Sequence, residues 1–182
     1  YNQIITYYKA LAETHTQIKL ETVGETDAGE PLHLIWYASD GNFDATNKAR
    51  LLVNNGIHPG ESDGIDATMM LYRDLAEGKV NAPENVVIAA IPVYNVGGCL
   101  NRNSGTRTNQ NGPKEYGFRG NGRNFDLNRD FIKSDTKNAR TFAMIFHHVN
   151  PDVFIDNHVS NGADYQYTLT HLFTQHNKLD GE

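Results

Sequence analysis

The sequence contains a single cysteine, Cys99, a single tryptophan and no long hydrophobic run. One cysteine excludes an intramolecular disulfide and a cysteine-based zinc site, and we expect Cys99 to be a small buried hydrophobe. The apolar runs, such as residues 86–93, are too short to cross a bilayer, so we expect no membrane span. The sequence also lacks an excess of positive charge. Its net charge of −6 argues against a nucleic-acid partner.

The length of 182 residues suits one domain, and the hydrophobic and charged fractions of 38% and 21% are ordinary for a globular protein. The chain begins at Tyr1 rather than Met, and residues 177–182 show no pattern that would close a domain. We therefore expect that a signal was removed or that the chain was cut from a longer protein. The sequence leaves the cellular location open, and we favour a secreted or periplasmic protein.

Apolar periodicity alternates between that of strands and that of helices. Helical spacing occurs in residues 2–14, 62–77 and 139–146, and β-formers occur in residues 17–23, 32–38, 49–54, 86–92 and 153–155. This alternation predicts an α/β fold with a mixed β-sheet and helices on both faces, in which the last two runs are buried strands. Residues 95–130 are rich in Asn, Gly and Arg and predict a long irregular stretch with a functional role.

Two potential metal ligands, His58 and Glu61, follow the predicted strand 49–54. Pro59 and Gly60 between them indicate a turn, so that the histidine ends a strand and the glutamate opens a helix. Ligand sites of open α/β sheets lie beyond the carboxyl ends of strands, and a hydrolytic zinc site takes nitrogen and oxygen ligands. The pair alone has a plain alternative, a surface histidine beside a glutamate that suits a helix N-terminus.

A third candidate ligand, His158, follows strand 153–155 just as His58 follows its own strand. Two histidines and one glutamate at strand ends match the ligand set of zinc peptidases. The alternative is a histidine with ordinary hydrogen bonds at the end of a sheet. The remaining histidines are assigned to structural or solvated positions: His15, His33, His147, His148, His171 and His176.

Residues 118–131 bring Arg119, Arg123 and Arg129 together in an acidic protein. The planar guanidinium binds carboxylates through two parallel hydrogen bonds, and the adjacent Asn128 adds a further donor. The alternative is a solvated basic loop. The apolar neighbours of Arg129 favour the anion site.

These motifs, taken in order, resemble the M14 family of zinc carboxypeptidases. The residues that carry the resemblance are His58-Pro-Gly-Glu61, Arg119, Asp126-Leu-Asn128-Arg129 and His158. The spacing from Arg119 to Arg129 and the N-terminal helix and hairpin are also similar to that family. Residues 1–182 would then be the N-terminal portion of an M14-like catalytic domain, with a zinc-carboxypeptidase-like fold that is incomplete at its C-terminus.

The resemblance implies a metallocarboxypeptidase that acts with one Zn²⁺ ion on a peptide, or on a small acylated amino acid, with a free carboxylate. It also implies a role for each matching position. His58, Glu61 and His158 would bind the zinc ion, and Asp126 would accept a hydrogen bond from the ring of His58. Arg119 would stabilise the oxyanion, and Asn128 and Arg129 would bind the terminal carboxylate of the substrate.

Two features depart from the family pattern. Asn95-Val96-Gly97-Gly98 stands where the family usually has Asn-Pro-Asp-Gly. The general-base glutamate and the capping tyrosine of the family lie well after the second zinc histidine, whereas the only glutamate after His158 is Glu182, the last residue. We therefore expect the base beyond residue 182, with Asp156 as the best substitute within the chain.

Two other functions remain open on the sequence. Zinc deacylases of the aspartoacylase and desuccinylase kind share His-x-x-Glu and Asp-Leu-Asn-Arg, although the long N-terminal helix and hairpin favour a peptidase. The chain could also be a zinc- or peptide-binding module that lacks its general base and has no catalytic activity.

Overall fold

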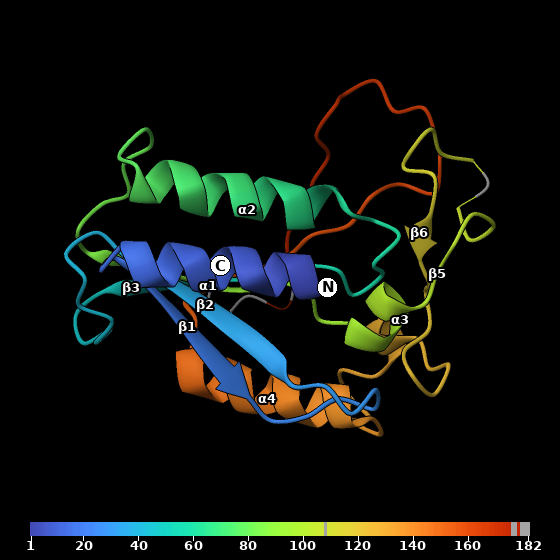
Figure 1. Cartoon of the computed structure of the whole chain (residues 1–182), viewed down its shortest axis with the longest axis horizontal. Helices are drawn as coiled ribbons and strands as arrows, with labels where there is room; N and C mark the ends of the chain where they lie inside the picture. The colour runs from blue at the N-terminus through green and yellow to red at the C-terminus, as the bar shows by residue number, and fades with distance from the viewer. Residues whose placement is uncertain (108, 176–177, 179–182) are drawn as a thin grey trace.

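The computed structural model describes residues 1–107, 109–175 and 178 (Figure 1). Its helices are α1 (Asn2–Thr14), α2 (Asp63–Ala76), α3 (Val96–Leu100) and α4 (Lys137–Val149), with a 3-10 turn η1 (Leu127–Arg129). Its strands are β1 (Ile18–Val23), β2 (Leu32–Ala38), β3 (Ala49–Asn54), β4 (Val86–Ile91), β5 (Arg102–Asn103), β6 (Tyr116–Gly117) and β7 (Val153–Asp156). Every helix and strand expected from periodicity is present, with bounds that differ by a few residues. In the described part of the chain no helix is long and apolar enough to span a bilayer.

The main sheet is mixed and has the strand order β1-β2-β4-β3-β7. β1 and β2 form the expected antiparallel hairpin, and β2 also pairs with β4 antiparallel. β3 runs parallel to both β4 and β7. Asn54 at the end of β3 stands opposite Asp156 at the end of β7, so the two strands end level with each other. The segments that follow them therefore leave the sheet side by side.

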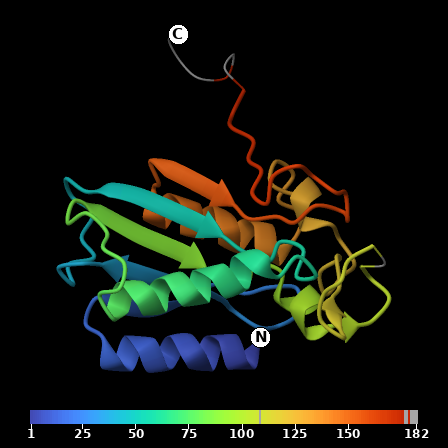
Figure 2. The same ribbon diagram turned by 90° about the horizontal axis from the view of Figure 1, so that it is seen from above.

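Helices cover both faces of the sheet, as expected (Figure 2). α1 and α2 pack on one face, where Ile35 of β2 shares a core cluster with Tyr72 of α2. α4 packs on the other face, where Leu34 lies in a cluster with Ile145. Successive side chains of a strand point to opposite faces, so a strand covered on both sides is apolar at every position. β2 is accordingly buried along its whole length.

The prediction that the last strand, residues 153–155, is buried is wrong. Val153, Phe154 and Ile155 of β7 are 55%, 38% and 42% exposed. β7 is the outer strand of the sheet, and no other strand of the described residues pairs with its free edge. An apolar run shows that a strand is suited to burial, but the order of strands in the sheet decides whether it is covered.

Residues 95–130 contain more secondary structure than the sequence indicated. They form α3, the small β5–β6 hairpin and η1, each of which is five residues long or shorter. Elements this short carry no periodicity, and side chains hold them together: Asn95 accepts from the amide of Gly98, and Asn121 accepts from the amide of Phe125. Cys99 lies in α3 and is buried, as expected.

Candidate metal centre

A tight turn after β3 presents His58 and Glu61 to the same side. The chain leaves β3 at Asn54 and bends at Gly56, whose φ of +64° lies in the left-handed region that favours glycine. The amide of Glu61 then donates to the carbonyl of His58 at 2.8 Å. Because α2 begins only at Asp63, Glu61 lies in the turn before the helix rather than in the helix itself. Both side chains are buried, at 3% and 4% exposure.

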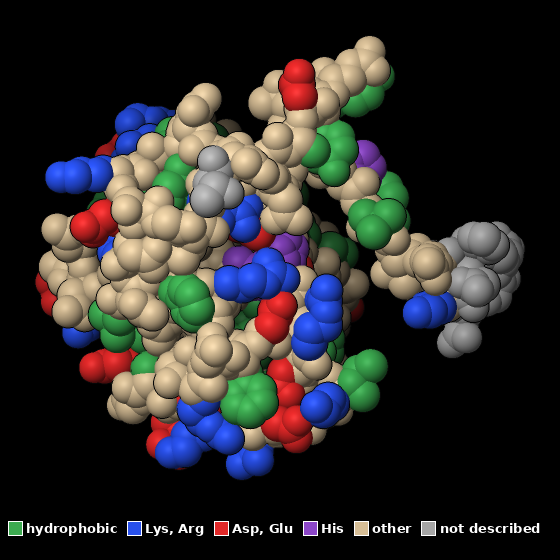
Figure 3. All heavy atoms as spheres, turned by 90° about the vertical axis from the view of Figure 1, so that its right-hand side faces the viewer, with side chains coloured by type: hydrophobic (Ala, Val, Ile, Leu, Met, Phe, Trp, Pro, Cys, Tyr) green, Lys and Arg blue, Asp and Glu red, His purple; other side chains and the backbone are tan. Residues whose placement is uncertain are grey.

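His158 joins this pair from the neighbouring strand, two residues beyond the end of β7. Its Nδ1 lies 3.0 Å from Glu61 Oε2, and His58 Nδ1 lies 3.3 Å from Glu61 Oε1. One ligand atom from each of the three residues lies within 4.8 Å of the other two. Two imidazole nitrogens and a buried carboxylate fit a zinc ion and leave a tetrahedral position open. Figure 3 views this end of the molecule and shows histidine side chains set between basic and acidic ones.

An aspartate backs each of the two histidines. Nε2 of His58 is 3.0 Å from Asp126 Oδ1, and Nε2 of His158 is 2.9 Å from Asp156 Oδ2. A histidine that donates its Nε2–H to a carboxylate can offer the lone pair of Nδ1 to a metal ion on its other side. Both Nδ1 atoms face Glu61, so the aspartates fix the rings in the orientation that a shared ion requires. The expected contact between Asp126 and His58 is therefore present.

The electrostatics of the site favour a cation. Burial opposes the ionisation of Glu61, but hydrogen bonds from His158, His58 and the amide of Val159 outweigh it and hold the pKa of the carboxyl well below its usual range. Burial alone would raise the pKa of Asp126. Hydrogen bonds from His58 and Arg119 outweigh burial, so the pKa of this carboxyl lies below its usual value. Hydrogen bonds to Asp156 and Glu61 raise the pKa of His158 to about 10, so without a metal ion this ring is protonated at neutral pH, and a bound metal ion would displace that proton. Ionised carboxylates therefore surround the histidine nitrogens at neutral pH.

Arg119 stands at the edge of this centre. Its Nε and Nη2 donate to Asp126 Oδ2 at 3.0 and 2.9 Å, and its Nη1 lies 3.4 Å from His58 Nδ1. The buried Asn95 donates to the backbone carbonyls of Ile57 and Arg119 at 3.3 and 2.9 Å. A guanidinium is thus held next to the candidate ligands, where it can meet negative charge that develops on a substrate.

Asn128 and Arg129 follow Asp126 in the turn η1. Asp126 caps this turn by accepting from the amide of Asn128 at 3.0 Å, and the fully buried Leu127 anchors it. Arg129 is exposed, and its Nη1 donates to the carbonyl of Asn128 at 2.8 Å. Among the described residues no carboxylate pairs with Arg129, so its guanidinium can accept an anion from outside.

The expected substitute base, Asp156, is already engaged. Its Oδ2 lies against His158, and its Oδ1 accepts from the side-chain amide of Asn54 at 2.9 Å. Because side chains alternate along a strand, Asp156 and His158, two positions apart, are expected to share a face. The contact agrees with that reasoning, and it also makes Asp156 the partner of a candidate ligand.

Sequence reasoning missed Arg107, which donates to Glu61 Oε1 at 3.1 Å. It also missed Asn95, whose side chain links the turn before His58 to the backbone of Arg119. Asn95 offered one signal, because it is a polar residue close after the apolar run 86–92. Arg107 offered none, since nothing in the Asn- and Gly-rich stretch around it shows which arginine turns inward.

The other histidines that the structure describes have structural or solvated positions, as expected. Nδ1 of His33 is hydrogen-bonded to the hydroxyl oxygen of Tyr1 at 2.9 Å, and His171 is exposed. His176 and Glu182 lie outside the described residues.

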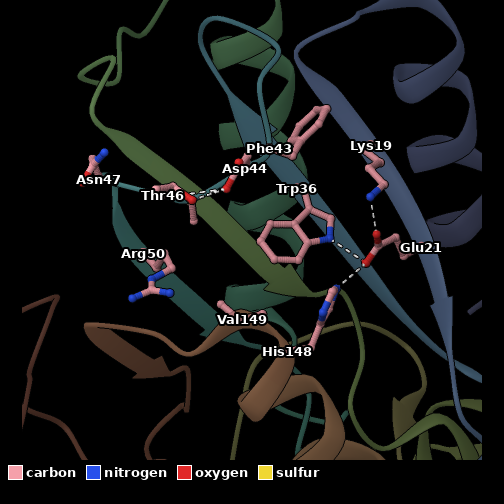
Figure 4. Close-up of a pocket in the computed structure, with 11 residues that line it drawn as sticks. Lys19, Glu21, Trp36, Phe43, Asp44, Thr46, Asn47, Arg50, His148 and Val149 are labelled. Atoms are coloured by element: carbon pink, nitrogen blue, oxygen red, sulfur yellow. Dashed lines mark hydrogen bonds and ion pairs between the residues drawn. The ribbon is translucent and has the colours of Figure 1, made fainter.

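A cavity of about 420 Å³ lies away from the metal centre (Figure 4). Trp36, Arg50 and His148 are among the residues that line it, and His148 Nε2 lies 3.2 Å from Glu21 Oε2. Arg50 belongs to the amino-terminal end of β3, whereas the candidate ligands follow its carboxyl end. The chemistry of the metal centre therefore lies at the opposite end of the strand from this cavity.

Solved carboxypeptidases share this fold. A metallo-carboxypeptidase from Burkholderia cenocepacia is 19% identical, with a TM-score of 0.70 over 88% of this chain and 41% of its own. The metallo-carboxypeptidase from Pseudomonas aeruginosa in complex with (2-guanidinoethylmercapto)succinic acid is 15% identical, with a TM-score of 0.62 over 85% and 39%. Bovine thrombin-activatable fibrinolysis inhibitor in complex with tick carboxypeptidase inhibitor is 15% identical, with a TM-score of 0.68 over 87% and 60%. These likenesses establish the fold.

The chain spans 41% of the Burkholderia cenocepacia enzyme, well under two thirds of its length. No curated protein matches it. The profile of the peptidase M14 family, described as zinc carboxypeptidase, matches residues 4–160 and so covers most of the sequence. The match includes every residue that carried the resemblance, from His58 to His158. By this match the chain belongs to the M14 family of zinc carboxypeptidases.

Proposed function

We propose that this chain carries the zinc-binding and carboxylate-binding residues of a metallocarboxypeptidase that releases C-terminal residues from peptides. The observation that carries the proposal is the convergence of His58, Glu61 and His158, whose ligand atoms lie within 4.8 Å of one another at the ends of two parallel strands. Membership of the zinc carboxypeptidase family supports both the reaction class and the metal.

Each residue around the centre then has a task. A zinc ion held by His58, Glu61 and His158 would polarise the scissile carbonyl and lower the pKa of a water molecule. Arg119, 3.4 Å from His58 Nδ1, would stabilise negative charge on the carbonyl oxygen. Asp126 holds both His58 and Arg119, so it links the orientation of a ligand to that of the oxyanion donor.

Asn128 and Arg129 would bind the terminal carboxylate of the substrate. The exposed guanidinium of Arg129 offers the two-pronged geometry that matches a carboxylate, and the turn η1 fixes both residues beside Asp126. A group that requires a free terminal carboxylate makes the enzyme an exopeptidase, because an internal peptide bond has no carboxylate at that place.

The general base is not assigned to the carboxylates near the centre. Glu61 accepts from several donors, Asp126 is bonded to His58 and Arg119, and Asp156 is bonded to His158 and Asn54. A carboxylate held in this way is a poor proton acceptor, so none of these three is proposed as the general base.

Two measurements test the proposal. Metal analysis of the purified protein should find one zinc ion, which a His58→Ala, His158→Ala double variant should lose; full zinc occupancy in the variant would refute the ligand assignment. Assays should then compare a blocked dipeptide of the hippuryl type with N-acyl amino acids. Faster cleavage of the peptide supports the carboxypeptidase, preference for the acyl amino acids would indicate a deacylase, and zinc binding without turnover would indicate a binding module.

A further inference from the structure

A second arginine, Arg107, reaches the metal centre from the loop between β5 and β6. Its side chain is only 11% exposed. Nη1 donates to Glu61 Oε1 at 3.1 Å, and Nη2 donates to the backbone carbonyl of Ser160 at 3.0 Å. Ser160 lies two residues after His158. One guanidinium therefore bridges the segment that bears Glu61 and the segment that bears His158.

Arg107 also completes the set of groups around the Glu61 carboxylate. Oε1 lies close to His58 Nδ1 as well as to Arg107, and Oε2 accepts from His158 Nδ1 and from the amide of Val159, each at 3.0 Å. The two imidazoles belong to the candidate ligand set. Arg107 and the Val159 amide stand outside it, so they are free to orient the carboxylate while the imidazoles and Glu61 hold a metal.

The backbone leaves room for this arginine at one position. A Cβ added to Gly60, next to Glu61, would lie 3.1 Å from both Cγ and Cδ of Arg107 and 2.9 Å from the carbonyl oxygen of Gly117. The arginine stem therefore occupies the space above Gly60. Gln110, on the same loop, donates to the Ser160 carbonyl as well, so the loop has two side-chain attachments to the segment after β7.

We propose that Arg107 is a positioning residue of the metal centre, which orients the Glu61 carboxylate and holds the His158 segment through Ser160. The inference rests on the proposed zinc-binding role of these residues. A positive charge beside a cation site opposes metal binding, so any benefit of Arg107 has to come from geometry. The planar guanidinium makes two directed hydrogen bonds at once, which a lysine ammonium on its flexible stem does not reproduce.

Arg107→Lys is therefore the decisive variant, because it keeps the charge and removes the two-pronged bridge. The experiment measures the zinc dissociation constant by competition with a chelator, using the whole protein in which this sequence occurs. Residues that orient metal ligands typically contribute about 10- to 100-fold in metal affinity, and we expect a loss of this size for Arg107→Lys.

The matched control is Arg102→Ala. Arg102 belongs to the same hairpin and donates to the carbonyl of Glu115, with no contact to the metal centre among the described residues. Its zinc affinity should equal that of the parent protein. The visible spectrum of the Co²⁺-substituted protein adds a readout that general destabilisation does not move, and it should change in Arg107→Lys but not in the control.

The outcomes separate this inference from the proposed function. If the parent protein binds zinc and Arg107→Lys binds it within about threefold as tightly, a difference below 1 kcal/mol, the positioning role is overturned while the metal site stands. If the parent protein binds no zinc, both proposals are overturned. Weaker zinc binding in Arg107→Lys, with unchanged zinc binding in Arg102→Ala, supports the role of Arg107.

Discussion

Replacing Asp126 with asparagine perturbs a candidate metal ligand and the candidate oxyanion donor at once. Oδ1 faces Nε2 of His58 and the amide of Asn128, each at 3.0 Å, and Oδ2 accepts from Nε and Nη2 of Arg119 at 3.0 and 2.9 Å. Asparagine has one acceptor oxygen and one NH2 group. Whichever way it is turned, the NH2 group meets donors, and the negative charge is lost.

The expected size of the effect follows from these contacts. Loss of the partner that orients a metal ligand typically costs about 10- to 100-fold in metal affinity, and we expect this loss in Asp126→Asn. The guanidinium of Arg119 is 46% exposed, so solvent screens its ion pair and its loss adds little to the effect on zinc. The effect on catalysis is separate, because removing an oxyanion donor costs about 100- to 1,000-fold in rate and a misplaced Arg119 should approach the lower figure.

The assay compares zinc affinity with kcat/KM measured at saturating zinc. Asp126→Asn should lower both, whereas Asp156→Asn, which contacts His158 but no arginine, should lower chiefly the affinity. Asp135→Asn is the matched control, since its side chain is 49% exposed and pairs with Lys133 in a neighbouring loop. Unchanged zinc affinity and unchanged kcat/KM in Asp126→Asn would refute the link between His58 and Arg119.

Three further predictions concern the carboxylate site, the pH dependence and the chain itself. Arg129→Ala should weaken hydrolysis of free-acid substrates by about 10- to 150-fold relative to their amides, the cost of one charge-assisted contact, and equal losses on both would show a structural role. Hydrogen bonds to Asp156 and Glu61 raise the pKa of His158 to about 10 in the metal-free protein. The free energy of unfolding that these bonds contribute is therefore fully present below the ordinary histidine pKa of 6.5 and is lost as the pH rises through 10. Urea unfolding of the metal-free protein between pH 6 and 10 should show this decline, and an equally steep decline in Asp156→Asn would contradict it. Residues 1–182 alone should hydrolyse peptides about 100- to 10,000-fold more slowly than the full-length protein, because the general base is expected beyond them, and comparable turnover would place the base within them.

The sequence was sufficient for the pattern of strands and helices and for the candidate ligands. Apolar periodicity is local, so the strands before His58 and His158 could be identified without knowing what they pack against. The Pro-Gly pair inside the His58–Glu61 segment fixed a turn, and His58 and Glu61 do share one side of it. The backing of His58 by Asp126 followed from the resemblance of the motifs, and the structure brings the two within 3.0 Å.

The order of strands in the sheet was decided by the tertiary structure. β7 pairs with β3 across about a hundred residues of sequence, and this pairing brings His158 to Glu61 while leaving Val153 and Phe154 exposed at the outer edge. Arg107 has no local signature either. Its partners lie 46 and 53 positions away along the chain, so its role depends on where a short hairpin folds back. Local pattern determines which segments form strands and turns, but contacts between distant segments exist only once the chain has packed, and these contacts bring together the candidate metal ligands.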